Sequence, residues 1–362
     1  MFNQGLKGVI ATQTEISDID GEKGKLIYRG YDAKELANNY RFEEVAYLLW
    51  YAKLPIDDEI VQLEQKLKQY RVLSPKLKEW VRSLPRNMDM MSVLRTSISL
   101  LGTNEFQWKP TLEQAIQISA LVPSIIAYRY HFIKGTKYNE PLAHLNHIEN
   151  YLYMLTGEIP SVAIAKALEA YMILTLEHGL NASAFSARVT ASTESDLVSA
   201  MTSAIGTMKG PLHGGAPSGV LELLEEISVK ERAEKVIREK LINGEKLMGF
   251  GHRVYKTHDP RSVALKEKLQ QSQGQDASLD LAIYVEQVAV RLLEEFKPGR
   301  ALYTNVEFYA AAIMKSIQLD VELFTPTFTA SRIVGWTTHV LEQADFNTIY
   351  RPQAEYVGKL YR

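Results

Sequence analysis

The chain has 362 residues and not one of them is cysteine. This absence excludes disulfide bonds, thiolate zinc sites, iron–sulfur ligation and a cysteine nucleophile. An excess of one charge sign is also lacking, since 41 lysine and arginine residues face 43 acidic ones and the formal net charge is −2. That balance argues against a nucleic-acid partner bound through bulk charge, although it leaves local basic patches open.

Long apolar runs and targeting signals are scarce as well. No basic stretch followed by an apolar run opens the chain, so we expect no secretory signal. The most apolar stretch, 116–133, is interrupted by Gln117, Pro123 and Arg129, which predicts a buried helix and no membrane span. Together these features predict a cytoplasmic protein, and the length predicts about two domains.

Helical patterns dominate what is present. Apolar residues recur at helical spacing over 74–85, 160–177, 230–243 and 278–297. Strand patterns are weak: only 9–16 and 25–28, on either side of an Asp20-Gly21 turn, suggest a small hairpin. The sequence therefore predicts an all-α fold with a small N-terminal β-hairpin.

Glycine and proline concentrate in two loops, 209–217 and 249–252, and each loop holds one histidine, His213 or His252. An imidazole in such a loop can reach a ligand without being committed to a core, so a functional and a structural role both stay open. His144 and His147 have a spacing that a metal could use, but no third ligand stands in a recognisable context, and we predict no metal site. We expect these two, His131 and His339 to be structural.

Two charged residues stand at predicted helix starts. Asp259 and Pro260 predict a helix whose first turn holds Arg261, where a cation is unfavourable unless an anionic ligand binds it. A surface arginine is the alternative. Thr304 and Glu307 fit a capping box, which would explain Glu307 structurally; the other interpretation is a carboxylate that acts as a base.

The sequence resembles the citrate synthase family over nearly its whole length, most closely the short bacterial type. The resemblance lies in the motifs at 21–31, 177–188, 210–216, 249–261, 305–309, 331–336 and 351–352. It implies an all-α homodimer whose substrates are acetyl-CoA and oxaloacetate, with no metal and no further cofactor. It also implies a discontinuous large domain, 1–213 and 313–362, and a small domain, 214–312, that closes over the substrate.

The resemblance assigns a role to each matching position. His213 would bind the acetyl-CoA carbonyl oxygen, His252 would polarise the oxaloacetate ketone, and Glu307 would remove a proton from the acetyl methyl group. Lys256 would lie near the CoA phosphates. The positions expected to hold the substrate carboxylates, the last from the partner subunit, are His178, Arg261, Arg332 and Arg351.

Glu307 departs from the family, which usually has aspartate there. The extra methylene lengthens the side chain, and a misplacement of about 1 Å can cost about a hundredfold in rate. We therefore expect a working but slower enzyme, unless the helix start has shifted to compensate. Two alternatives remain open at this point: a 2-methylcitrate synthase that uses propionyl-CoA, and a catalytically silent helical scaffold or regulator.

Overall fold

The computed structural model describes residues 2–214, 216–252, 254–270 and 277–360. Gly215 and Arg253, which belong to two of the motifs above, lie outside the described residues. Within these ranges the chain is mostly helical and carries one small antiparallel sheet, so the all-α prediction is confirmed. None of the described helices is long and apolar enough to cross a membrane.

The described ranges contain seventeen α-helices. The first nine are α1 Ala33–Asn39, α2 Phe42–Tyr51, α3 Asp57–Tyr70, α4 Pro75–Ser83, α5 Met90–Ser99, α6 Leu112–Lys134, α7 His147–Thr156, α8 Val162–Thr175 and α9 Ala182–Ala191. The rest are α10 Leu197–Met208, α11 Pro211–Gly214, α12 Ala216–Ile227, α13 Lys230–Ile242, α14 Pro260–Gln270, α15 Ala277–Phe296, α16 Val306–Ser316 and α17 Phe324–Asp345.

Local sequence signals account for several helix ends. The Ser74 hydroxyl accepts a hydrogen bond from the Leu77 amide at 3.2 Å and starts α4 at Pro75. Gly244, at φ +74°, follows the end of α13. The apolar stretch inside α6 is buried, as predicted.

The N-terminal sheet differs from the predicted hairpin. Its strands are β1 Ser17–Asp20, β2 Lys25–Tyr28 and β3 Tyr31–Asp32, in the order β1-β2-β3. The predicted strand over 9–16 is wrong, because Val9 and Ile10 are 45% and 88% exposed and lie in an irregular arm. Pairing begins only at Ser17, opposite Tyr28, and the turn of the hairpin is formed by residues 21–24.

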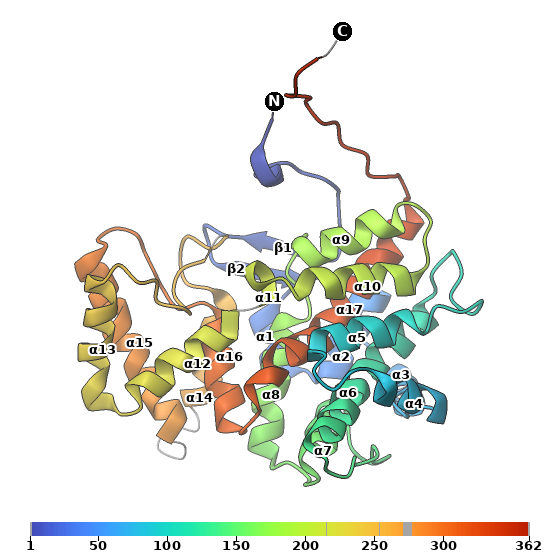
Figure 1. Ribbon diagram of the computed structural model, residues 1–362, viewed down its shortest axis with the longest axis horizontal. Helices are drawn as coiled ribbons and strands as arrows, with labels where there is room; N and C mark the ends of the chain where they lie inside the picture. Colours follow the sequence, from blue (N-terminus) through green and yellow to red (C-terminus); the bar gives the residue numbers. More distant parts are fainter. Residues whose placement is uncertain (1, 215, 253, 271–276, 361–362) are drawn as a thin grey trace.

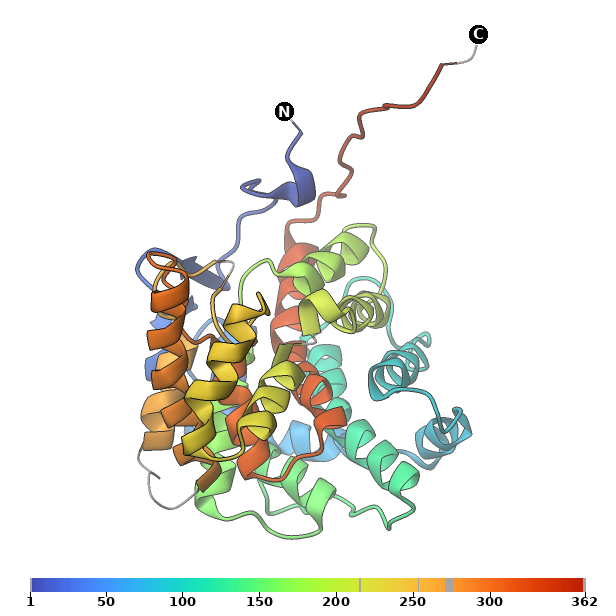
Figure 2. The same cartoon turned by 60° about the vertical axis from the view of Figure 1, so that its left-hand side comes forward.

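Two groups of helices surround the central helix α17 (Figure 1). Helices α12 to α16 pack on one another at the left of Figure 1, whereas α17 packs against α2, α6, α8, α9 and α10. Nearly the whole of α17 is buried. The N-terminal arm, with the short 3-10 helix Gln4–Leu6, and the C-terminal tail project from the same side of the molecule in both views (Figures 1 and 2).

Candidate active site

Six of the eight predicted site residues line one cavity of about 900 Å³. They come from segments far apart in the chain: the α8–α9 connection, α11, the loop before α14, and the starts or middles of α14, α16 and α17. The six are His178, His213, His252, Arg261, Glu307 and Arg332. Lys256 is exposed on the loop after His252, and Arg351 lies in the C-terminal tail; neither lines this cavity.

The backbone fixes the tautomer of His252. Its Nδ1 accepts hydrogen bonds from the amides of Val254 and Tyr255, at 3.0 and 3.1 Å. Nδ1 is therefore unprotonated, and in the neutral ring the proton sits on Nε2. Burial, assisted by the charge of Arg261, lowers the pKa of His252 to about 4, so the ring is neutral at pH 7.

The Nε2–H group of His252 faces a second donor. Nη2 of Arg261 lies 3.3 Å from this nitrogen, and a guanidinium can only donate. Two donors this close are both satisfied when an oxygen acceptor binds beside them. The pair thus forms a neutral donor and a cationic donor directed at one oxygen-bearing ligand.

A buried carboxylate holds Arg261. Asp259 accepts hydrogen bonds from Nε at 3.0 Å and Nη2 at 2.8 Å, and it also caps α14 through the Arg261 amide. Burial alone would raise the pKa of Asp259, but Arg261 holds it below its usual value. An internal anion thus accounts for this arginine in the first turn, where the sequence suggested an external ligand or a surface position.

Asp259 also reaches a second helix. Its Oδ2 accepts the amide hydrogen of Val306, the first residue of α16, at 3.0 Å. One carboxylate therefore joins the start of α14, which carries Arg261, to the start of α16, which carries Glu307. From the sequence we expected only the capping role for Asp259.

Asn305 caps the helix that carries Glu307, and the predicted capping box is wrong by one residue. The Asn305 side chain accepts the Glu307 amide at 3.1 Å, whereas the Thr304 hydroxyl donates to Glu286. The Glu307 carboxylate forms no hydrogen bond with any described residue, so capping does not explain it. Burial raises its pKa to about 7, with Arg261 and Arg332 opposing the rise and Asp259 adding to it.

His213 stands beside a hydroxyl that can set its tautomer. Its Nε2 lies 2.7 Å from Oγ of Ser183, which accepts the Trp336 indole N–H at 3.0 Å and donates its own proton to Oδ1 of Asn181 at 2.7 Å. Because that single proton goes to Asn181, Ser183 accepts from Nε2–H of His213, while Nδ1 has no hydrogen-bond partner in the described ranges. Burial, with the charge of Arg332, lowers the pKa of His213 to about 4.

Two more groups give the cavity a cationic, hydrogen-bonding wall. Arg332 is 2% exposed; its Nε donates to the Thr175 carbonyl oxygen at 2.5 Å and its guanidinium lies over Phe328. Nε2 of His178 is 3.1 Å from the hydroxyl of Tyr255. Burial lowers the pKa of His178 well below its ordinary value, and the nearby arginines add to this. The wall fits a small dianion.

Sequence reasoning missed the residues behind this site. Glu286 is buried and accepts hydrogen bonds from Thr304 at 2.8 Å and Tyr309 at 2.7 Å, so it braces α16 on both sides of Glu307. A charged residue on the apolar face of a predicted helix was the one available signal. Ser183 lies in the motif at 177–188, but its contact with His213, thirty positions further along the chain, leaves no local signal.

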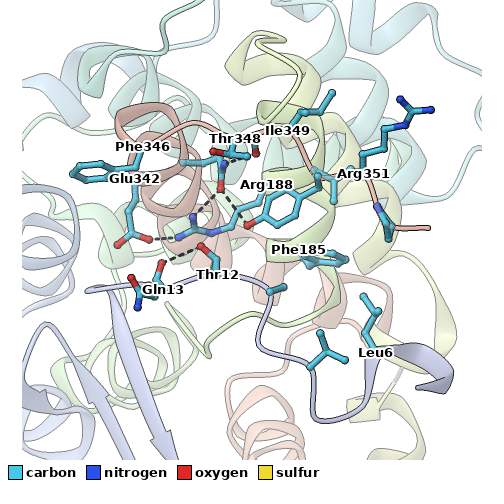
Figure 3. A pocket seen from close by; sticks show the side chains of 16 residues that line it. Leu6, Thr12, Gln13, Phe185, Arg188, Glu342, Phe346, Thr348, Ile349 and Arg351 are labelled. Carbon is cyan, nitrogen blue, oxygen red and sulfur yellow. Dashed lines mark hydrogen bonds and ion pairs between the residues drawn. The ribbon is translucent and has the colours of Figure 1, made fainter. Parts of the chain in front are cut away.

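Arg351 lines a separate pocket of about 620 Å³ between the two terminal segments (Figure 3). Arg188 and Glu342 form an ion pair at its centre, and Arg351 points away from them. The pocket wall is largely apolar, with Leu6, Phe185, Phe346 and Ile349 among its residues. Arg351 itself is exposed, so within one chain it does not reach the other site residues.

Three of the other five histidines make contacts that support the fold, whereas the structural role predicted for the exposed His144 stays a prediction. His131 bonds to Thr136 and to the Met154 carbonyl oxygen, His147 stacks on Phe42, and His339 bridges Glu177 and Arg188. In the ranges that the structure describes, no group of three or more histidine, aspartate or glutamate side chains is arranged to hold a metal ion.

Comparison with known proteins identifies one family over nearly the whole chain. Residues 5–353 match the family described as "Citrate synthase, C-terminal domain". The chain is 41% identical to citrate synthase 2 of Bacillus subtilis over 364 residues, covering 98% of this chain and 95% of the relative. It is 39% identical to the 2-methylcitrate synthase of Shewanella oneidensis over 360 residues, covering 98% and 94%.

One of the similar solved structures is a complex with bound ligands. It is the ternary complex of carboxymethyl coenzyme A and oxaloacetate with citrate synthase from Thermoplasma acidophilum. Its TM-score to this chain is 0.89 at 28% identity, with 100% of this chain and 97% of that one covered.

Fold, site and relatives together define an acyltransferase that forms a carbon–carbon bond. The chain belongs to the citrate synthase family. Its relatives include both citrate and 2-methylcitrate synthases at about the same identity, so the acyl group is a separate question.

Proposed function

We propose that this enzyme is a citrate synthase, which condenses acetyl-CoA with oxaloacetate and hydrolyses the citryl thioester to citrate and CoA. One observation carries the proposal: a carboxylate of raised pKa, Glu307, shares a cavity with neutral His213 and His252 and with two buried arginines. A base, two donors and a dianion site are what this condensation requires.

Proton removal is the difficult step. A gap of about ten pKa units between a thioester methyl group and a carboxylic acid corresponds to about 14 kcal/mol for complete transfer. The raised pKa of Glu307 makes it a stronger base, and its ionised form takes the methyl proton. His213 stabilises the developing enolate oxygen from Nδ1, which requires Ser183 to turn its proton from Asn181 to Nε2 of the ring when the acyl-CoA binds.

Carbon–carbon bond formation uses the opposite side of the cavity. The methyl carbon attacks the ketone carbon of oxaloacetate, the C=O π bond breaks, and the ketone oxygen takes the proton on Nε2 of His252. His178, Arg261 and Arg332 hold the carboxylates and fix the reacting carbons at short range. Water then cleaves the thioester and CoA leaves with a proton.

The full site is proposed to need two subunits and two domains. The terminal segments project from one side of the molecule, and the pocket beside Arg351 has an apolar wall, which suits a second copy of the chain. Arg351 then reaches the partner's oxaloacetate. We further propose that the small domain, 214–312, closes on the large one and brings Lys256 toward the CoA phosphates; both boundaries fall inside helices, α11 and α16.

Use of propionyl-CoA is the second candidate, favoured by the 2-methylcitrate synthase among the relatives. The two substrates differ by one methylene, which is worth about 1–3 kcal/mol of discrimination. Measuring kcat/KM for both thioesters, with the product identified by mass spectrometry, decides between them. We expect at least about a tenfold preference for acetyl-CoA. A preference for propionyl-CoA would assign the chain to the second activity.

A further inference from the structure

The turn between β1 and β2, residues 21–24, packs against the loop that carries His252. The carbonyl oxygen of Gly21 accepts the amide hydrogen of Lys256 at 2.9 Å. A Cβ atom on Gly21 would lie 2.4 Å from the carbonyl oxygen of Val254, and one on Gly24 would lie 2.7 Å from that of His258. Backbone therefore touches backbone at both ends of this contact.

The same loop segment holds His252 from the other side. The amides of Val254 and Tyr255 donate to Nδ1 of His252, and the next amide, that of Lys256, donates to Gly21. Three consecutive N–H groups are thus divided between the imidazole and the turn. A displacement of the loop at Gly21 changes the hydrogen bonds that decide which nitrogen of His252 carries the proton.

We propose that the β1–β2 turn is a positioning element for His252, which acts by holding the backbone of residues 254–256 against the imidazole. The inference deepens the proposed function and rests on the role that this function gives to His252. Gly21 positions the loop and touches no substrate.

Gly21 and Gly24 differ in backbone conformation. Its φ lies outside the left-handed region, so an alanine could adopt the same backbone there. Glycine is required by the approach of Val254 alone. Gly24, at φ +62°, is constrained both by its conformation and by its contact. Gly21→Ala therefore tests the contact without straining the turn.

The experiment compares Gly21→Ala with Glu22→Ala, a change in the same turn at an exposed side chain. We expect kcat to fall by about 10- to 100-fold for Gly21→Ala and to stay within twofold for Glu22→Ala. Histidine-selective ¹³C and ¹⁵N NMR gives a readout independent of activity. The His252 signals of Gly21→Ala should titrate at least one pH unit above those of the wild type, whose pKa is about 4. The His213 signals should not move.

Amide hydrogen exchange of the wild-type protein provides a second test if Gly21→Ala does not fold. The amides of Val254, Tyr255 and Lys256 should be protected together and exchange at one common rate. Free exchange of the Lys256 amide would overturn the proposal, as would unchanged kcat and His252 signals in Gly21→Ala. Neither the NMR nor the exchange result depends on turnover, so an inactive wild type would refute the proposed function and leave this inference separately decidable.

Discussion

The Asn305 side chain accepts the backbone amide of Glu307, two residues along the chain, at 3.1 Å. This bond starts α16 at Val306, one residue later than the predicted capping box would place it. The Glu307 carboxylate is thereby released from any capping role and lines the cavity beside Arg261 and Arg332. Because Asn305 caps the helix, the Glu307 carboxylate stays available to accept a proton.

Shortening the base should accelerate the enzyme. The resemblance implies aspartate at this position, and we expect the extra methylene of Glu307 to misplace the carboxylate oxygen; a misplacement of about 1 Å can cost about a hundredfold in rate. We expect Glu307→Asp to raise kcat, and Glu307→Gln to reduce it by at least about 10³-fold because no base remains. An unchanged or lower kcat in Glu307→Asp would show that α16 already places the longer side chain correctly.

The acid limb of the pH profile should report Glu307. Burial raises its pKa to about 7, and only the ionised form accepts a proton. As pH falls below 7, kcat/KM for the acyl-CoA should drop by about tenfold per unit. His213 and His252 stay neutral down to about pH 4, so they do not set this limb. A limb centred near pH 4.5 would contradict a desolvated base.

The ion pair of Asp259 with Arg261 should contribute much more to the free energy of unfolding than an exposed ion pair does. Its side chain is 1% exposed and that of Arg261 is 5% exposed, so Asp259→Asn leaves a buried cation without its counter-charge. We expect a loss of about 3–5 kcal/mol in the free energy of unfolding, measured by urea denaturation. Asp345→Asn, which breaks the exposed pair with Lys109, is the matched control and should cost less than about 1 kcal/mol. Equal losses would refute the linking role of Asp259.

Mixing two inactive variants should test the proposed sharing of Arg351. Arg351→Ala and Glu307→Gln are each expected to be inactive as homodimers. If Arg351 serves the partner's site, each mixed dimer contains one intact site, and random exchange restores up to about a quarter of the wild-type activity. No restoration after subunit exchange, followed by native mass spectrometry, would place Arg351 in the site of its own chain.

The sequence predicted those features that depend on residues close to one another along the chain. Ser74, Asp259 and Gly244 mark helix ends by side-chain capping or left-handed backbone, and these positions were predictable. The segment 9–16 was mispredicted because its β-branched residues favour a strand, whereas in the described ranges no partner strand pairs with it. The glycine loops and the family motifs located six residues of one cavity.

Contacts between segments far apart in the chain could not be predicted from the sequence. Neither the Ser183–His213 pair nor the contact of Gly21 with Val254 leaves a local signal, since each depends on packing between distant segments. Thr304 fits a capping pattern, but its hydroxyl donates to Glu286 and accepts from Ser262 at 3.1 Å, and Asn305 caps α16 in its place. Tertiary contacts therefore decide which of two neighbouring residues caps the helix.

Release of CoA from acetyl-CoA by the wild-type protein, followed with a thiol reagent with and without oxaloacetate, tests the proposed condensation. We predict rapid release when both substrates are present, citrate formed in equal amount, and negligible release without oxaloacetate. Release that ignores oxaloacetate would indicate a simple thioesterase. No release with both substrates bound would contradict the assignment of Glu307, His213 and His252 as a working catalytic site.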